Sequence, residues 1–304
     1  MKKSGSGHPY FILSLVILVW GLNYIVGRCL SSTVVFGYVH ITGVLFAFLR
    51  YLTGALTMII ALAFRKRRLR EILEEMRPYG KVLSISILAS SIFVLSANQS
   101  QFYVSSGTTS IIINLFPLFV LIYGIRYLDE KVTIQKITGF ALGFIGGLMF
   151  LYSSLQGAGG FYMGTGILLS IVAMAAWAGY TLTLYYLGGA DRVTVLGVQL
   201  TISSLLIVPF LGIYALSYPL AFVFDIWSIL GILFSGVITS GIIYILYFKA
   251  IEMVGAPRSA SFLFLIPFVS LLGDVMLKEL PQPVALIGGM MAILGVALIK
   301  KDSS

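Results

Sequence analysis

The chain has 304 residues, of which 59% are apolar and only 10% are charged. A soluble domain carries about 25% charged residues, so this chain cannot cover a surface in water and belongs in a lipid bilayer. The net charge of +9 would suit a nucleic-acid-binding protein, but nearly all charges lie in short loops between apolar stretches, which excludes that class. The single cysteine, Cys29, excludes an intramolecular disulfide and a cysteine-based metal site, and we expect no cofactor.

Apolar stretches of membrane-spanning length follow one another along the whole chain. A spanning helix needs about 20 mostly apolar residues, and this rule predicts ten spans. They cover roughly 10–29, 40–64, 79–103, 105–128, 134–153, 162–187, 193–216, 226–251, 255–277 and 283–299. We therefore predict an all-α polytopic membrane protein.

One long pattern occurs twice, in the same order, in the two halves of the chain. Each copy has a proline in the middle of an apolar helix, then a glutamate in a turn, then a glycine-rich helix. The first copy has Pro117, Glu130, Gly139 and Gly146, and the second has Pro267, Glu279, Gly288 and Gly295. The prolines are 150 positions apart (267 − 117) and the other counterparts 149 (279 − 130). A period of half the chain indicates an internal duplication, with repeats at 10–153 and 162–300.

The basic residues predict how the spans are oriented. Of the 20 Lys and Arg residues, all but Arg28, Arg50 and Lys278 fall on one side of a ten-span model. Basic loops face the cytoplasm, so both termini are predicted to be cytoplasmic and the protein to lie in the cytoplasmic membrane. Five spans per half is an odd number, which predicts that the second repeat is inverted. Inverted repeats place a substrate site where the halves meet, near the bilayer midplane.

Further paired motifs accompany the duplicated pattern. They are Trp20-Gly21-Leu22-Asn23 and Phe48-Leu49-Arg50-Tyr51 in the first half, and Trp177-Ala178-Gly179-Tyr180 and Val198-Gln199-Leu200 in the second. This doubled, ordered set resembles the drug/metabolite transporter superfamily, and specifically its EamA-like permeases. The resemblance implies ten helices and secondary transport of a small metabolite, often export of an amino acid or a related compound. The halves differ in that Gln199 stands where the first half has Arg50.

Arg50 is the full charge that falls near the middle of a predicted span. An arginine at that depth costs about 2.5–3.5 kcal/mol on insertion scales, so it should face a partner or a wet cavity. Two interpretations remain open. Arg50 pairs with an anionic part of the substrate, or it makes a fixed contact to backbone carbonyls or to an acid such as Asp274.

Amides and aromatic rings within the spans are the other candidate substrate contacts. They are the amides of Asn23, Asn98, Gln99, Gln101, Asn114 and Gln199, and the rings of Trp20, Tyr24, Trp177 and Tyr180. The alternative for each amide is a hydrogen bond between helices, worth about 0.6 kcal/mol. The alternative for each ring is packing.

Pro117 and Pro267 are predicted gating elements. Each removes one helical hydrogen bond, which is expected to free the carbonyls of Ile113 and Leu263. The resulting kinks either bend during gating or are static. Small residues in the glycine-rich helices predict close helix contacts, either within one chain or across a dimer, so the chain is a monomer or a homodimer.

Two functional classes follow. A secondary transporter fits the duplication, with a small molecule as its substrate and the bilayer as its surroundings. An intramembrane enzyme acting on lipid or peptide is the alternative. Such an enzyme would need a nucleophile with a histidine, and His8 and His40 lie at span edges with no acid expected nearby. Because no predicted span has a central Asp or Glu, a facilitator or exchanger is favoured over a proton antiporter.

Overall fold

A computed structural model describes residues 8–129, 132–155 and 160–277, together with 283–284, 287–288, 290–291, 294–295 and 298. In this part of the chain, eight helical segments are long and apolar enough to cross a membrane, and a ninth at Ile134–Met149 is shorter. The prediction of an all-helical polytopic membrane protein is confirmed. Most of the tenth predicted span, and both Glu130 and Glu279, lie outside the described residues.

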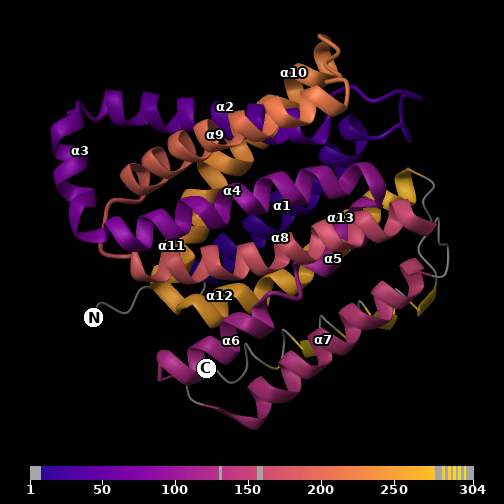
Figure 1. The fold of residues 1–304 in the computed structure, drawn as a ribbon. Helices are drawn as coiled ribbons and strands as arrows, with labels where there is room; N and C mark the ends of the chain where they lie inside the picture. The colour runs from indigo at the N-terminus through magenta and orange to yellow at the C-terminus, as the bar shows by residue number, and fades with distance from the viewer. Residues whose placement is uncertain are drawn as a thin grey trace.

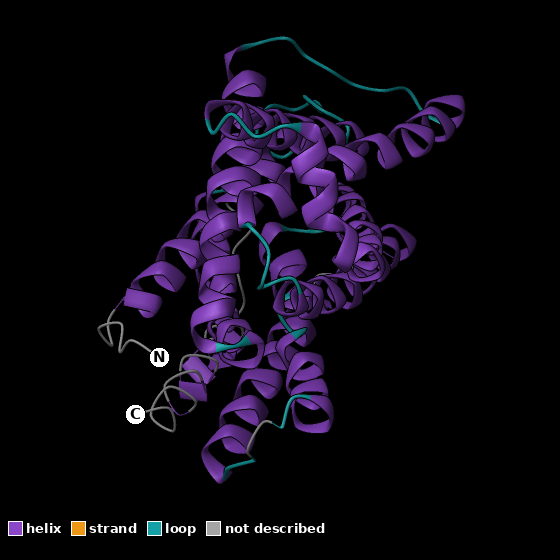
Figure 2. Ribbon diagram, turned by 90° about the vertical axis from the view of Figure 1, so that its left-hand side faces the viewer, coloured by secondary structure: helices purple, strands orange, loops and turns teal. Residues whose placement is uncertain are grey.

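The described elements are helices joined by loops (Figure 2). The first half contains α1 (His8–Ser31), α2 (Gly43–Phe64), α3 (Leu69–Met76), the 3₁₀ turn η1 (Arg77–Tyr79), α4 (Gly80–Tyr103), α5 (Ser106–Ile113), α6 (Pro117–Tyr127) and α7 (Ile134–Leu155). The second contains α8 (Gly160–Tyr186), α9 (Arg192–Ser217), α10 (Ile226–Leu233), the π-helix η2 (Phe234–Ile243), α11 (Tyr244–Val254), α12 (Ala256–Phe262), the 3₁₀ turn η3 (Leu263–Leu265) and α13 (Ile266–Met276). The long helices run side by side, and α3 lies across one end of the bundle (Figure 1).

The two predicted helices with a central proline are each broken at that proline. A turn separates α5 from α6 just before Pro117, and the 3₁₀ turn η3 separates α12 from α13 just before Pro267. The expectation that the prolines free two carbonyls is wrong. The N–H of Phe116 donates to the Ile113 carbonyl at 3.1 Å, and the N–H of Ile266 donates to the Leu263 carbonyl. A tighter turn therefore satisfies the carbonyl that the proline cannot.

The glycine-rich helices of the two halves contact each other within one chain. A Cβ on Gly288 would overlap the Gly146 carbonyl, and a Cβ on Gly295 would overlap the Gly139 carbonyl. Gly139 is the counterpart of Gly288 in the duplication, and Gly146 is the counterpart of Gly295. Gly139 of the first half therefore contacts Gly295, the repeat equivalent of Gly146, and Gly146 contacts Gly288, the repeat equivalent of Gly139. A two-fold axis between the halves produces this reciprocal pattern.

Ion pairs tie the loops together at the α3 end of the bundle. Arg65 after α2 lies 3.1 Å from the Asp191 carboxylate, which also caps α9 by accepting the Thr194 N–H at 2.9 Å. Glu75 of α3 accepts the N–H of Asp191 at 2.8 Å and pairs with Arg67. The α2–α3 loop is thereby joined to the α8–α9 turn.

At the opposite end, the loop between α1 and α2 is joined to the loop between α9 and α10. Ile41 and Phe222 form an isolated antiparallel bridge. The Nε2 atom of His40 lies 3.0 Å from the Asp225 carboxylate. The expectation that no acid lies near His40 is wrong, because this bridge brings together two residues that are 185 positions apart.

Replacing Gly295 with alanine tests the glycine contact. The added Cβ has no room against the Gly139 carbonyl, so the free energy of unfolding in detergent should fall by about 1–3 kcal/mol. Gly164→Ala is the control, because nothing lies within 4 Å of the Cβ that it adds. Equal stability of the two variants would show that the helices do not meet at this glycine.

Replacing Asp191 with alanine tests the α3 end. Partial burial alone would raise the pKa of Asp191, but hydrogen bonds from Thr194 and the Arg65 charge outweigh it and lower that pKa. Losing the helix cap should cost about 1 kcal/mol of unfolding free energy at pH 7. Because folding lowers the pKa of Asp191, the stability that its carboxylate contributes should be fully present above about pH 3.9, the pKa of the group in the unfolded chain. This contribution should be lost as the pH falls through the lower pKa of the folded protein. Glu74→Ala is the control, because the Glu74 side chain is exposed and its loss should change the unfolding free energy little at either pH. If Asp191→Ala lost the same unfolding free energy at pH 3 as at pH 7, the proposed role of the carboxylate would be wrong.

Candidate substrate site

A cavity lies in the middle of the bundle, between helices of both halves, and we call it the central cavity. Its volume is about 20 Å³, so the cavity is almost closed in this structure. It is lined by Trp20, Asn23 and Tyr24 of α1, Arg50 of α2, Phe93, Ala97 and Gln101 of α4, Ile113 and Asn114 at the α5–α6 break, Trp177 of α8, Tyr244 of α11 and Ile266 of α13. Most of this lining comes from the first half, and Trp177, Tyr244 and Ile266 close it from the second.

Arg50 carries the charge of the central cavity. Only 4% of the Arg50 surface is exposed. Its Nε donates to the Ser240 hydroxyl at 2.8 Å, and its Nη2 donates to the Tyr244 hydroxyl at 3.5 Å. Its Nη1 makes no hydrogen bond, and no carboxylate of the described residues is within ion-pairing distance. The described lining of the cavity therefore contains a cation and no anion.

Asp274, the acid considered as a fixed partner for Arg50, lies elsewhere. Its carboxylate accepts the Gly107 N–H at 2.9 Å and the Ser105 hydroxyl at 3.1 Å, and it also bonds the Ser106 hydroxyl. These groups form the N-terminus of α5, where a negative charge is favourable. Asp274 thus joins the two proline-broken helices and leaves Arg50 without its charge.

A π-helix positions the groups that hold Arg50. Ser240 lies within η2, and Tyr244 begins α11 directly after it. A Cβ on Gly236 would overlap the Thr53 side chain and lie 2.9 Å from the Arg50 carbonyl, so only glycine lets η2 approach α2 this closely. π-Helical segments of this kind occur often at functional sites.

Three buried polar atoms of the lining residues lack a hydrogen-bond partner among the described residues. They are Nε1 of Trp20, Oδ1 of Asn23 and Oε1 of Gln101. A buried polar group without a partner costs about 1–3 kcal/mol. Residues with donor groups (Arg50, Trp20) and residues with acceptor groups (Asn23, Gln101) thus line the same cavity, although the Gln101 Oε1 lies against Gly27 of α1. Such a lining suits a solute that carries both an anionic and a hydrogen-bond-donating group.

Aromatic rings form the remaining wall. The Trp177 ring lies at the centre of it, with ring centroids 5.1 Å from Trp20, 4.4 Å from Phe93 and 5.9 Å from Tyr244. Trp20 and Trp177 occupy paired places in the two halves, so they meet edge to face across the contact between the halves. Such rings exclude water and present an apolar surface to a bound solute.

The predicted site residues are divided by the structure. Trp20, Asn23, Tyr24, Arg50, Asn114 and Trp177 line the central cavity. Tyr180 lies behind this wall, with its ring 4.9 Å from that of Trp177, and Gln199 lies beside the Tyr180 hydroxyl.

Asn98 and Gln99 are placed outside the cavity. The Asn98 amide donates to the Val94 carbonyl within its own helix at 2.6 Å, and Gln99 lines a separate hollow with Tyr214 of α9. Gln101, which the sequence analysis named among the amides, does line the central cavity, whereas sequence reasoning did not select Phe93 and Tyr244 as lining residues. The four-residue spacing of Phe93, Ala97 and Gln101 on one helical face was the available signal.

Among the described residues, no group of three His, Cys, Asp or Glu side chains is placed to hold a metal ion.

Comparison with known proteins identifies the family. A model of the EamA-like transporter family matches residues 8–152 and, a second time, residues 164–300. The chain belongs to the EamA-like transporter family. This EamA-like protein, a member of the drug/metabolite transporter superfamily, is therefore a multi-pass membrane transporter of small molecules and not an enzyme.

Relatives of this EamA-like protein match over most of its length. It is 25% identical over 293 residues to an uncharacterized transporter of Archaeoglobus fulgidus, covering 95% of this chain and 98% of the relative. It is 29% identical over 168 residues to a probable amino-acid metabolite efflux pump of Salmonella typhimurium, covering 55% and 50% of the two chains. A crystal structure with 16% identity superposes with a TM-score of 0.73 over 99% of this chain and 100% of the other, which shows a shared fold.

Proposed function

We propose that this EamA-like protein is a secondary transporter that moves an amino acid or a related small carboxylate across the cytoplasmic membrane. The observation that carries the proposal is Arg50, a buried cation in the central cavity without a carboxylate partner among the described residues. A carboxylate bound there would neutralise the guanidinium and use its free nitrogen. Charge-assisted hydrogen bonds of this kind are about twice as strong as neutral ones.

The other lining groups suit the rest of such a solute. The acceptor oxygens of Asn23 and Gln101 could receive hydrogen bonds from an ammonium group, and the rings of Trp20, Tyr24 and Trp177 could enclose its carbon atoms. Asn114 supplies a further amide, while Tyr180 and Gln199 support the wall from behind. Amino-acid substrates also agree with the names of two relatives, the probable efflux pump and a probable terminal-alkyne amino-acid exporter of Streptantibioticus cattleyicolor, which is 25% identical over 214 residues.

Alternating access would arise from two inverted five-helix repeats, at 10–153 and 162–300, that rock against each other. The reciprocal glycine contacts support this arrangement, since they relate the halves as a two-fold axis would. The one-sided Lys and Arg distribution supports a cytoplasmic location for the α3 end and for both termini. The transport unit in this proposal is the single chain, whether it acts as a monomer or within a homodimer.

No Asp or Glu lines the central cavity in the part of the chain that the structure describes. Facilitated diffusion or exchange is therefore favoured over proton antiport.

Arg50→Ala tests the substrate site. In proteoliposomes loaded with amino acids, the variant should lose at least about tenfold in exchange rate, because a hydrogen bond to a charged group contributes about 1.5–3 kcal/mol. Arg70→Ala is the matched control, since Arg70 is an exposed arginine of α3 paired with Glu74. Size-exclusion profiles should show that both variants fold. Exchange at the wild-type rate by a folded Arg50→Ala protein would refute the proposed site.

Pro117→Ala and Pro267→Ala test whether the breaks move. Each change restores a backbone N–H and lets the helix run on, so the exchange rate should fall about tenfold while substrate affinity changes less than about threefold. Pro209→Ala is the control, because α9 continues through Pro209 without a break. If both break variants exchange at the wild-type rate, the breaks are static.

A further inference from the structure

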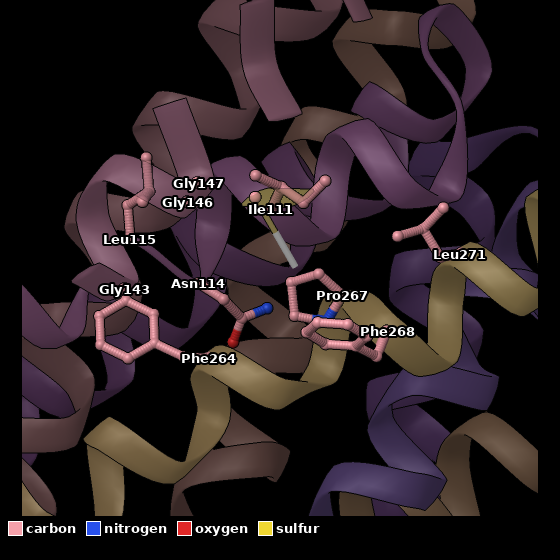
Figure 3. Close-up of a pocket in the computed structure, with 11 residues that line it drawn as sticks. Ile111, Asn114, Leu115, Gly143, Gly146, Gly147, Phe264, Pro267, Phe268 and Leu271 are labelled. Carbon is pink, nitrogen blue, oxygen red and sulfur yellow. The ribbon is translucent and has the colours of Figure 1, made fainter. Parts of the chain in front are cut away.

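Side chains leave little space beside the proline breaks. Figure 3 shows Ile111, Asn114 and Phe268 around Pro267, and the hollow that they help to line has a volume of about 20 Å³. A space of this size has room for about one water molecule. A further ligand therefore has no room at the breaks. Groups that the transport site leaves unused lie instead on the surface, at the α3 end of the bundle.

The helix α3 lies at the level where the bundle leaves the bilayer. α4 has 24 residues and is therefore about 36 Å long, which is enough to cross a hydrocarbon core of about 30 Å without α3. α2 ends at Phe64, shortly before α3 begins. In Figure 1, α3 crosses the direction of these two helices at the end of the bundle. It therefore lies along the membrane surface and does not span the membrane.

One face of α3 is apolar, and only part of that face is covered by protein. Met76 is buried, and Ile72 packs against the same core. Leu69 and Leu73 are 71% and 60% exposed, and Phe64 at the end of α2 is 85% exposed. The two leucines lie beside the two covered residues, because positions three and four apart share a helix face. An amphipathic helix of this kind packs one side on the bundle and turns the other toward lipid chains.

Basic side chains flank α3 and give this end of the bundle a positive charge. Residues 65–81 contain seven Lys or Arg and three Glu, a net charge of +4 (7 − 3). Three of the arginines are occupied in ion pairs with carboxylates, namely Arg65, Arg67 and Arg70. The other four cations are exposed and form no ion pair with a described residue. They are Lys66 and Arg68 before the helix, and Arg77 and Lys81 after it.

Lys66 occupies a backbone position that favours glycine. Its φ is +53°, in the left-handed region. Its N–H donates to the Ala63 carbonyl at 2.9 Å, and the Arg67 N–H donates to the Leu62 carbonyl at 3.1 Å. These two bonds form a Schellman motif, in which glycine is the usual left-handed residue because a side chain there adds strain. A lysine therefore stabilises this turn less than glycine would, which points to a use for its charge.

We propose that α3 and its flanking residues form a binding surface for anionic phospholipids, on the side of the membrane that the basic loops assign to the cytoplasm. The exposed leucines contact the acyl chains, and the four cations without an ion pair bind the headgroups. The partner is a lipid because the apolar and the cationic groups occur together at the boundary between hydrocarbon and water. A soluble phosphate would use only the cations. This inference is independent of the transported solute.

Binding of short-chain phosphatidylglycerol to the purified full chain, measured by calorimetry in a nonionic detergent, tests the proposal. Phosphatidylcholine with the same acyl chains is the neutral comparison. The anionic lipid should bind at least about fivefold more tightly, since one Lys or Arg near a membrane surface contributes about that factor. Arg68→Gln combined with Arg77→Gln should weaken phosphatidylglycerol binding about tenfold or more and change phosphatidylcholine binding less than about twofold. Arg70→Gln combined with Glu74→Gln is the matched control, because it removes an exposed ion pair and keeps the net charge.

Two further variants separate lipid binding from a role in the fold. Leu69→Ser combined with Leu73→Ser should weaken the binding of both lipids about tenfold or more, because the acyl chains lose apolar contacts. Leu216→Ser is the control, at an exposed leucine in the last turn of α9, away from α3. Lys66→Gly should raise the thermal stability, because glycine relieves the left-handed turn, and yet weaken phosphatidylglycerol binding about fivefold.

The possible outcomes decide the proposal without involving Arg50. Equal affinity of the wild type for the two lipids, or full phosphatidylglycerol binding by the Arg68→Gln and Arg77→Gln protein, would overturn it. Loss of the leucines without effect on either lipid would also overturn it and leave a site for phosphate alone. A change of oligomeric state in the leucine variant, with lipid binding unchanged, would make α3 a contact between two copies of the chain. Transport at the central cavity would stand in each of these cases.

Discussion

The structure depends on the guanidinium of Arg50, which is buried inside a membrane protein and has no carboxylate partner among the residues that the structure describes. Ser240 and Tyr244 satisfy two nitrogens of Arg50, and the approach of η2 to α2 at Gly236 keeps these groups in reach. The remaining nitrogen faces a space lined by unpartnered polar atoms and aromatic rings. A charge at this depth is costly, and such charges mark substrate or ion pathways in membrane proteins. This arrangement supports our proposal that the cavity binds an anion.

Contacts at both ends of the bundle enclose this space, and they are unequal. Ion pairs around Asp191 tie the loops at the α3 end, while the Ile41–Phe222 bridge and the His40–Asp225 pair tie those at the other. Asp274 also joins α13 to the N-terminus of α5, whereas the positions 150 and 149 earlier (274 − 150 and 274 − 149) hold Gly124 and Ile125, neither of which has a carboxylate. The duplicated halves therefore share a fold without sharing their closing contacts. Opening one end requires breaking polar contacts that have no equivalent at the other.

Local patterns in the sequence predicted the features that are determined within a single helix. Apolar length predicted the spans, and the membrane cost of a charge selected Arg50. The small residues of the glycine-rich helices predicted close helix contacts, within one chain or across a dimer, and Pro117 and Pro267 predicted kinks where the structure has breaks. Contacts between distant segments were not predictable. Asn98 and Gln99 were grouped with Gln101 because they are neighbours in sequence, yet each residue turns about 100° around a helix, and only Gln101 shares the face of Phe93 and Ala97. The acid beside His40 was missed because it is supplied by a loop 185 positions away.

The central claim is that the transported solute brings the negative charge that Arg50 lacks. The most direct test is to compare the affinities of L-norvaline and of its carboxamide, L-norvalinamide, for the purified protein. The two ligands share a side chain and an ammonium group and differ in the charge of one group. The account predicts that the carboxylate binds at least about tenfold more tightly, because a hydrogen bond to a charged group contributes about 1.5–3 kcal/mol. Equal affinity of the two ligands would contradict it.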